Sequence, residues 1–255
     1  MKVTKGVLID LGGVVYQGNA LLDGSAEAIG LLREAAKPFR FLTNTTSQPL
    51  AGILAKLEAL GLPTAPEEIF TPAIAARAFL AGHGLEPECV FPALLKEDLG
   101  TLPTGGRPAV VIGDARENFT YATLNDIFRR IEAGAEFIAL ASNRQFVDAD
   151  GRPSLDVGAF VAALEYATGK TAVVLGKPSA AFFHLAVADM GLRPGEAVMI
   201  GDDAEFDVAA AIEAGLGGYL VHTGKWRQGA ADGLDHQPTG EFANLLEAVR
   251  FFAGR

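Results

Sequence analysis

The feature that most constrains this chain is a regular alternation of short apolar runs with longer segments of helical period. The run Gly6–Ile9 is followed by a helical segment over Ser25–Ala36, and the order recurs with the run Phe39–Leu42 and the segment Leu50–Leu60. This alternation is typical of βαβ units, in which helices cover both faces of a parallel sheet. The sequence therefore predicts an α/β fold around a parallel sheet.

The same pattern continues to the end of the chain. A helix is predicted from Pro72 to about Gly82, because Thr71-Pro72 is typical of a helix N-terminus. In the middle of the chain, the predicted strands and helices are Cys89–Phe91, Ala109–Ile112, Tyr121–Ala133, Phe137–Ala141 and Val157–Thr168. From Val173 onward, a strand is followed by the predicted elements Ala180–Met190, Ala197–Ile200, Ala204–Ala214, Gly218–Val221 and about Glu241 to Phe252.

Charge and composition exclude several kinds of partner. The net charge is -10, so the surface repels polyanions, and we expect neither nucleic acid nor an anionic membrane as a partner. Asp10 interrupts the first apolar run, and no apolar stretch approaches the length of a membrane span. The single cysteine, Cys89, cannot form an internal disulfide and fits a reducing compartment. These features predict a soluble, cytoplasmic protein.

Polar residues follow four of the predicted strands. They are Asp10, Thr43 with Asn44, Lys177, and Asp202 with Asp203. In open α/β sheets the working residues lie just beyond the carboxyl ends of the strands. A single acid in such a place is usually a helix cap or a turn residue, but four strand ends with complementary residue types are hard to explain as caps. The sequence therefore predicts a site at this edge of the sheet.

The chemistry of these residues fits phosphoryl transfer. The Asp10 carboxylate can attack phosphorus and form an aspartyl-phosphate intermediate. Asp202 can share Mg²⁺ with it, because this cation prefers oxygen ligands. Thr43 and Asn44 offer a hydroxyl, an amide and backbone N–H groups to phosphoryl oxygens. Lys177 would neutralise the nucleophile and the charge that develops in the transition state.

With these residues in place, the chain resembles the haloacid dehalogenase superfamily, whose four motifs match Asp10, Thr43-Asn44, Lys177 and Gly201-Asp202-Asp203 in order. Within it, the chain most resembles phospholysine phosphohistidine inorganic pyrophosphate phosphatase and its sister group, haloacid dehalogenase-like hydrolase domain-containing 2. The stretches that carry this likeness are Leu42–Thr46, Leu155–Gly158, Ala163–Ala167, Val174–Pro178, Ala197–Asp203 and Thr223–Lys225. The insertion between the second and third motifs resembles the subclass with a large α/β cap.

This resemblance implies a Rossmann-like core of residues 1–80 and 173–255, with an α/β cap of residues 81–172 inserted as a lid. It implies one Mg²⁺ held by the carboxylates of Asp10 and Asp202 and the backbone carbonyl of Gly12, with Asp207 supporting the metal through water. A charge at a helix N-terminus is the alternative role of Asp207. Asp203 is expected to support the metal site indirectly or to cap the helix that follows.

The resemblance also implies the residues that contact substrate. Asp10, Thr43 and Lys177 are the expected catalytic residues, and Gly12, Thr43, Asn44 and Lys177 would hold the phosphoryl group. The substrate would be a small phosphorylated molecule or a phospho-amino acid. Asn143 and Arg144, which follow a predicted strand of the insertion, are candidate substrate-binding residues, with a solvated turn as the alternative. A homodimer is compatible with the resemblance.

One position departs from the superfamily's pattern. Most of its phosphatases carry a second aspartate, a general acid and base, two residues after the nucleophile, where this chain has Gly12. Without that acid, an alcohol must leave as an alkoxide, about as basic as hydroxide, the conjugate base of water (pKa about 15.7). An imidazole (pKa about 6.5) or a phosphate (second pKa roughly 6) leaves far more easily. Gly12 therefore favours P–N or phosphoanhydride substrates such as phosphohistidine, phospholysine and pyrophosphate.

Two other functions remain open from the sequence. A general phosphomonoesterase acting on a sugar, nucleotide or cofactor phosphate would use the same motifs. A pseudo-enzyme that binds a phosphorylated metabolite with negligible turnover is the alternative from another class, and Gly12 is the feature that favours it. The presence of Asp10, Lys177 and Asp202 argues for catalysis.

Overall fold

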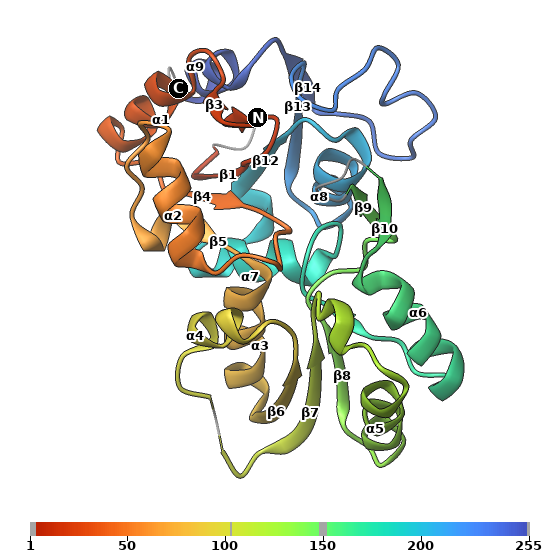
Figure 1. The fold of residues 1–255 in the computed structure, drawn as a ribbon. Coiled ribbons are helices and arrows are strands. Elements are labelled where there is room, and N and C mark those ends of the chain that lie inside the picture. Colours follow the sequence, from red (N-terminus) through yellow and green to blue (C-terminus); the bar gives the residue numbers. More distant parts are fainter. Residues whose placement is uncertain (1–3, 103, 148–151, 254–255) are drawn as a thin grey trace. The chain divides into compact units, whose positions relative to one another are not determined.

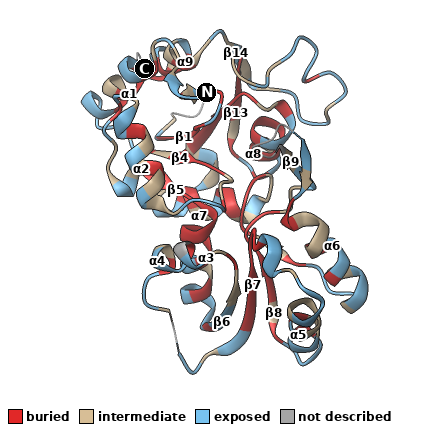
Figure 2. Cartoon of the chain, viewed as in Figure 1, coloured by how far each residue is buried: buried red, intermediate tan, exposed pale blue. Residues whose placement is uncertain are grey.

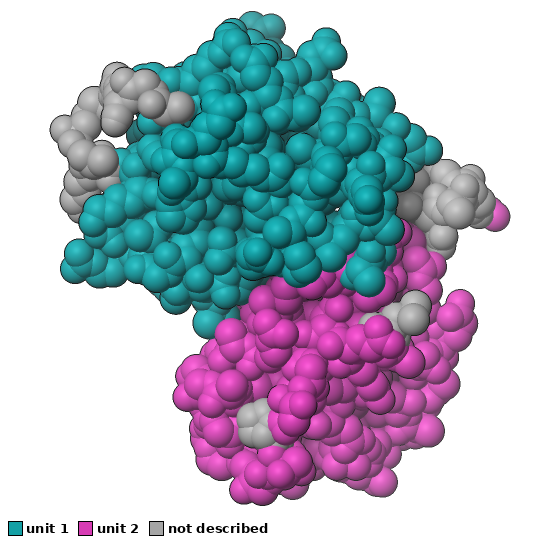
Figure 3. Space-filling view, turned by 90° about the vertical axis from the view of Figure 1, so that its left-hand side faces the viewer, with its two compact units in different colours: residues 1–43, 51–70, 177–255 teal, residues 44–50, 71–176 magenta. Residues whose placement is uncertain are grey.

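The structure, a computed structural model, describes residues 4–102, 104–147 and 152–253 (Figure 1). They form two compact units (Figure 3). The first contains the described residues up to 43, 51–70 and those from 177 onward, and the second contains 44–50 and 71–176. The sequence placed these boundaries after residues 80 and 172. The ends of the predicted core, residues 1–3 and 254–255, lie outside the described residues.

The first unit is built on a six-stranded sheet in which all neighbouring strands are parallel. The strands, in spatial order, are β14 (Gly240–Phe242), β13 (Gly217–Val221), β12 (Ala197–Gly201), β1 (Gly6–Asp10), β4 (Phe39–Leu42) and β5 (Ile69–Phe70). Every residue of β1 and β12 is buried (Figure 2). Burial on both faces explains why these strands are continuous apolar runs rather than alternating ones. The prediction of a Rossmann-like parallel core is confirmed.

Helices and a small hairpin complete this unit. The helices are α1 (Ser25–Glu34), α2 (Leu50–Ala59), α7 (Ala180–Asp189), α8 (Ala210–Glu213) and α9 (Leu245–Ala253). Helix α1 packs on α9, and α7 packs on α8. The hairpin joins β2 (Tyr16–Gln17) to β3 (Ala20–Leu21). Within the described ranges, no helix is both long enough and apolar enough to cross a membrane.

Two of the predicted helices differ from the structure. The helix predicted from about Glu241 begins at Leu245, because residues 240–242 form the edge strand β14. The Asn244 side chain accepts a hydrogen bond from the Glu247 N–H at 3.1 Å, which is the bond of a helix N-cap. The predicted helix Ala204–Ala214 starts as a π-helical segment over Ala204–Ala209 and becomes α-helical only in α8.

The second unit has its own parallel sheet, which lies among four helices (Figure 1). Its strands, in spatial order, are β11 (Val173–Val174), β8 (Glu136–Ala139), β7 (Arg107–Ile112) and β6 (Leu85–Val90). The helices are α3 (Pro72–His83), α4 (Lys96–Leu99), α5 (Tyr121–Glu132) and α6 (Val157–Thr168). An antiparallel hairpin pairs β9 (Gln145–Val147) with β10 (Pro153–Leu155). Thr71 caps α3 through the Ile74 N–H at 3.2 Å, as predicted.

Candidate active site

Asp10 and Asp202 lie close together because the strands that precede them are neighbours. Strand β1 pairs with β12 in parallel, with Ile9 opposite Ile200. Asp10 is the last residue of β1, and Asp202 follows β12 directly. Strand β4 flanks β1 on the other side and ends at Leu42, one residue before Thr43. The carboxyl ends of these three strands therefore bring Asp10, Asp202 and Thr43 to one edge of the sheet. The strand order changes direction at this point, and open α/β sheets bind ligands there.

Lys177 joins this group from the loop that precedes α7. Its ammonium group donates hydrogen bonds to Asp10 Oδ1 and to Asp207 Oδ1, the second at 2.6 Å. Lys177 is 6% exposed and Asp207 is 2% exposed. Hydrogen bonds between buried charged groups are stronger than those between neutral groups. Lys177 therefore holds the Asp10 carboxylate in a fixed place beside Asp207.

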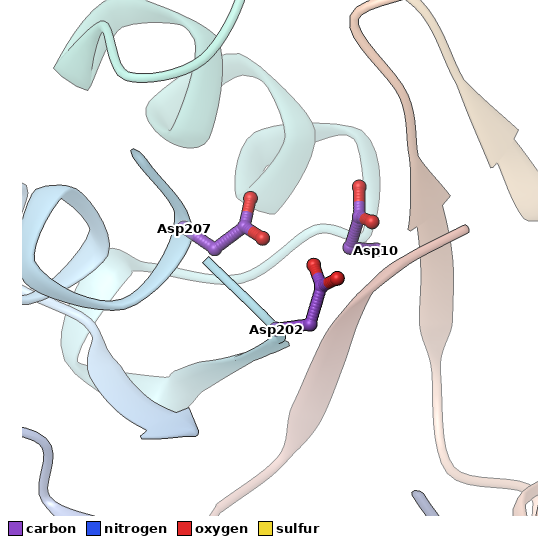
Figure 4. A group of neighbouring side chains, drawn as sticks. All are labelled: Asp10, Asp202 and Asp207. Carbon is purple, nitrogen blue, oxygen red and sulfur yellow. The ribbon is translucent and has the colours of Figure 1, made fainter. Parts of the chain in front are cut away.

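Three carboxylates converge in this buried site. One oxygen each of Asp10, Asp202 and Asp207 lies within 4.8 Å of the others, and Figure 4 shows the side chains facing one another. With all three acids ionised and Lys177 protonated, three negative charges and one positive charge leave two uncompensated negative charges. An excess of buried charge is costly unless a further cation binds.

The pKa values reflect this crowding. Burial raises the pKa of Asp10, and Lys177 offsets only part of the rise. Burial also raises the pKa of Asp202, and raises that of Asp207 to about 6 against the opposing charge of Lys177. Burial alone would lower the pKa of Lys177, but Asp10 and Asp207 outweigh it and raise that pKa, so the ammonium group stays protonated. A bound cation would reverse the shifts of the carboxyl groups.

Asp202 gives the clearest indication that the site can bind a cation. Its Oδ2 accepts a hydrogen bond from the Lys225 N–H at 2.7 Å. Its Oδ1 is buried and has no hydrogen-bond partner in the described part of the chain. An unsatisfied buried polar atom costs about 1–3 kcal/mol, and more when it is charged. Mg²⁺ prefers hard oxygen ligands such as these carboxylates. The residues present therefore fit the cation that the sequence predicted.

The segment after β12 places Asp207 and uses Asp203 as a cap. Asp203 Oδ1 accepts hydrogen bonds from the N–H groups of Glu205 at 3.2 Å and Phe206 at 3.0 Å. This confirms the capping role expected for Asp203. A Cβ at Gly201 would stand 2.6 Å from Asp207 Cγ, so a glycine at 201 makes room for the Asp207 side chain. The π-helical turn lies in the same segment, and such turns are frequent at functional sites.

Comparison with known families identifies this arrangement. A family model described as haloacid dehalogenase-like hydrolase matches residues 7–113, and a second, haloacid dehalogenase hydrolase-like model matches residues 174–248. The rat protein named haloacid dehalogenase-like hydrolase domain-containing protein 2 is 40% identical over 93% of this chain and 91% of its own length. The chain belongs to the haloacid dehalogenase superfamily of hydrolases.

Other proteins similar to this haloacid dehalogenase-like hydrolase are named as phosphatases. The zebrafish (Danio rerio) phospholysine phosphohistidine inorganic pyrophosphate phosphatase is 37% identical over 89% of the chain and 86% of its own length. Among solved structures, the p-nitrophenyl phosphatase from Archaeoglobus fulgidus superposes with a TM-score of 0.84 at 26% identity, covering 98% of this chain and 99% of that one. The prediction that the chain belongs to this superfamily and resembles these two named groups is confirmed.

Gly12 of this hydrolase lies in the loop that follows Asp10. It is exposed, and its φ lies outside the left-handed range that favours glycine. No atom of the described residues stands within 4 Å of a Cβ built at this position. Backbone geometry and neighbouring atoms thus leave room for a side chain at Gly12, in contrast to the next residue, Gly13, where a Cβ would overlap Asp202 Oδ2.

The remaining predicted residues are divided between the units. Thr43 is buried at the end of β4, while Asn44 belongs to the second unit. Asn143 and Arg144 also lie in the second unit, where their carbonyl groups accept hydrogen bonds from the N–H groups of Gly158 at 3.0 Å and Asp156 at 3.2 Å. These bonds tie the loop after β8 to the start of α6. The roles of all four residues in substrate binding stay predictions.

Sequence reasoning missed two features of the site. It did not predict that Asp207 pairs directly with Lys177, because residues 30 positions apart give no local signal of contact. It also assigned no role to Thr223–Lys225, although it noted this stretch as similar to relatives.

Proposed function

We propose that this hydrolase is a Mg²⁺-dependent phosphatase in which Asp10 is the nucleophile. The observation that carries the proposal is the surroundings of Asp10, whose carboxylate is buried, bonded to Lys177 and grouped with Asp202 and Asp207. One Asp10 oxygen would attack phosphorus while the bond from phosphorus to the leaving group breaks and the leaving group keeps the electron pair. Water would then hydrolyse the aspartyl-phosphate, releasing phosphate and restoring Asp10.

Lys177 supplies the fixed positive charge for this reaction. Its ammonium group stays protonated, and its bond to Asp10 keeps the attacking carboxylate oriented. Thr43, with Asn44, would donate hydrogen bonds to the phosphoryl oxygens. When bound by Asp10, Asp202 and the Gly12 carbonyl, with Asp207 in support, Mg²⁺ would add positive charge beside the phosphoryl group. Electrostatic stabilisation of this kind dominates catalysis of phosphoryl transfer.

The substrate class follows from what Gly12 lacks. A carboxyl group at this position would protonate the leaving group in the first step and activate water in the second. Because glycine can do neither, we expect substrates whose leaving groups need little protonation. Phosphohistidine, phospholysine and pyrophosphate meet this condition, and the zebrafish relative is named for these three substrates. The p-nitrophenyl ester in the name of the archaeal phosphatase is also an activated ester.

The second unit is proposed to be the cap that selects the substrate. Its main segment, 71–176, interrupts the first unit in sequence, and it carries a sheet and a hydrophobic core of its own. Ile112, Ile131 and Val161 belong to that core, which is independent of the residues around Asp10. Asn143 and Arg144, on the loop after β8, are the residues proposed to contact the part of the substrate beyond phosphorus.

A phosphate-release screen tests the proposal. The protein is incubated with pyrophosphate, phosphohistidine, phospholysine and a set of alkyl phosphates, with Mg²⁺ or with a chelator. We expect Mg²⁺-dependent release that is fastest from the first three substrates. Borohydride added during turnover should reduce the acyl phosphate and convert Asp10 to homoserine, which mass spectrometry detects. Rapid release with the chelator present, or release without labelling of Asp10, would contradict the mechanism.

A further inference from the structure

The segment Thr223–Lys225, which follows β13, is bonded to the loop after the nucleophile. The Thr223 hydroxyl donates a hydrogen bond to the Gly13 carbonyl oxygen at 2.5 Å. Two residues later, the Lys225 N–H donates to Asp202 Oδ2 at 2.7 Å. The Lys225 side chain turns elsewhere, to Asp203 at 3.2 Å. The segment therefore bonds to Asp202 through its backbone, and the charge of Lys225 acts on Asp202 without a hydrogen bond.

Two glycines enclose the Asp202 carboxylate within this arrangement. Gly13 has a φ of 85° and Gly224 has a φ of 53°, both in the left-handed region that favours glycine. A Cβ at either glycine would overlap Asp202 Oδ2. A Cβ at Gly13 would also stand 3.0 Å from Gly224 Cα, and one at Gly224 would stand 2.6 Å from Gly13 Cα. Only bare backbone fits on these two sides of the carboxylate.

The consequence for Asp202 is a single orientation of its two oxygens. Oδ2 is held by the Lys225 N–H and lies against Gly13 and Gly224. Oδ1 is buried and has no hydrogen-bond partner among the described residues. The side chain faces Asp10 and Asp207 (Figure 4). Rotation of the carboxylate would break the bond at Oδ2, and the glycine contacts resist movement of the whole side chain.

We infer that Gly13, Thr223, Gly224 and the Lys225 N–H form a carboxylate clamp that positions Asp202 for the divalent cation. The clamp orients the carboxylate before the cation arrives, so that binding does not have to fix the side chain. These are positioning residues, because they act through Asp202 and do not contact the reacting atoms. Groups that orient metal ligands typically contribute about 10–100-fold to metal affinity. This inference rests on the proposed function, since it assumes a cation at Asp202.

Cation titration of matched glycine variants tests the clamp. Mg²⁺ binding to the full chain is measured by calorimetry for the wild type, Gly224→Ala and Gly84→Ala. Gly84, at the end of α3, has a φ of 60°, and no described atom lies within 4 Å of its built Cβ. Gly84→Ala therefore carries a similar backbone strain without the clash. We expect Gly224→Ala to weaken Mg²⁺ binding by about 10–100-fold and Gly84→Ala to leave it unchanged.

A second pair of variants avoids any change of glycine. Thr223→Val removes the hydroxyl that bonds to Gly13, and Thr223→Ser keeps it. We expect weaker Mg²⁺ binding in the valine variant and near wild-type binding in the serine variant. Thermal unfolding without Mg²⁺ identifies a temperature at which each variant is folded, and affinities are compared there. A purely structural role of Thr223 would lower the unfolding temperature without changing affinity in the folded protein.

Two outcomes would overturn the inference at different levels. If Gly224→Ala and Thr223→Val bind Mg²⁺ as tightly as their controls, while Asp202→Asn binds it weakly, the clamp is wrong and the metal site stands. If Asp202→Asn binds Mg²⁺ as tightly as the wild type, the cation does not use Asp202. The metal site of the proposed function then fails together with the clamp.

Discussion

The two parallel sheets of this protein both end in buried acids, but only one of them leaves its acids uncompensated. In the second unit, β7 is followed by Asp114, which is 7% exposed and pairs with Arg116 at 3.3 Å. Asp156 in the same unit accepts the Val157 N–H at 2.7 Å and caps α6. In the first unit, by contrast, Lys177 bonds to Asp10 and Asp207, while Asp202 Oδ1 has no hydrogen-bond partner among the described residues.

The difference indicates which property distinguishes the candidate active site from the other buried acids. Burial raises the pKa of Asp114, as it raises that of Asp10, so the direction of the pKa shift does not separate the two places. The two places differ in whether neighbouring groups compensate the charge of the acids. An acid beside an arginine or at a helix N-terminus is explained by its own surroundings. The three acids around Lys177 carry an excess of buried negative charge, which a further cation would offset.

The largest expected effect is the loss of the proposed nucleophile, Asp10. Asp10→Asn keeps the shape of the side chain but removes the attacking charge, so turnover should fall by about 10⁴-fold or more. Asp114→Asn is the matched change in the second unit. It should lower turnover by less than about tenfold, because it removes no interaction with the reacting atoms. Steady-state phosphate release measures both. An equal loss in the two variants would remove the distinction between the two edges.

The next effect comes from adding an acid to the uncompensated edge. Gly12 has room for a side chain and an ordinary φ, so Gly12→Asp should fold. A positioned acid–base group contributes about 10²–10⁴-fold, and the gain should appear with alkyl phosphates, whose leaving groups need a proton. Pyrophosphate and phosphohistidine should gain less. Comparison of kcat/KM across these substrates tests this, and rapid alkyl ester hydrolysis by the wild type, unchanged in Gly12→Asp, would show that another group moves the proton.

A third prediction concerns stability. If Mg²⁺ relieves the charge excess, a concentration 100 times its Kd should raise the free energy of unfolding by about 2.7 kcal/mol. Asp202→Asn should abolish most of this increment, whereas Asp114→Asn should preserve it. Denaturant unfolding of each variant with Mg²⁺ and with a chelator gives the increment directly. Retention of the full increment in Asp202→Asn would place the stabilising cation elsewhere, and its loss in Asp114→Asn would show that the increment is not specific to the first unit.

The smallest effect is expected at a compensated acid within the first unit. Glu68 accepts two hydrogen bonds from Arg33, at 2.8 and 2.6 Å. Burial raises the pKa of Glu68, but Arg33 and the Ala65 N–H outweigh it and lower the pKa. A lowered carboxyl pKa stabilises the fold above the unfolded pKa, and this stability is lost as the pH falls through the folded value. Glu68→Gln should cost about 0.5–1 kcal/mol at pH 7, discounted for partial exposure, and nothing at strongly acidic pH.

The sequence predicted the centre of the site better than its surroundings. Asp10 and Asp202 could be placed because each directly follows a continuous apolar strand, and parallel strands bring such residues to one edge. Helix α6 was predicted at its observed ends, Val157 and Thr168, because its apolar residues follow a helical period, and in the structure Asp156 caps it. In these places, local pattern and tertiary structure require the same residues.

Other features depend on contacts that no local pattern records. Strand β5 has only two residues, Ile69 and Phe70, too few for a periodic signal, and it forms because β4 offers an edge to pair with. Strand β14 was taken for the start of a helix, because its pairing with β13 is a long-range contact. The clamp around Asp202 was invisible for the same reason, since it joins Gly13 to Gly224 across most of the chain.

The open space at Gly12 has an evolutionary consequence. Some glycine codons become aspartate codons by a single base change, and neither the backbone nor any described neighbour obstructs the new side chain. Under the proposed function, the step from an enzyme suited to labile phosphoryl donors to one that also hydrolyses stable esters is therefore a short one. Under that function, the absence of a side chain at Gly12 limits the enzyme to labile phosphoryl donors and spares stable phosphate esters.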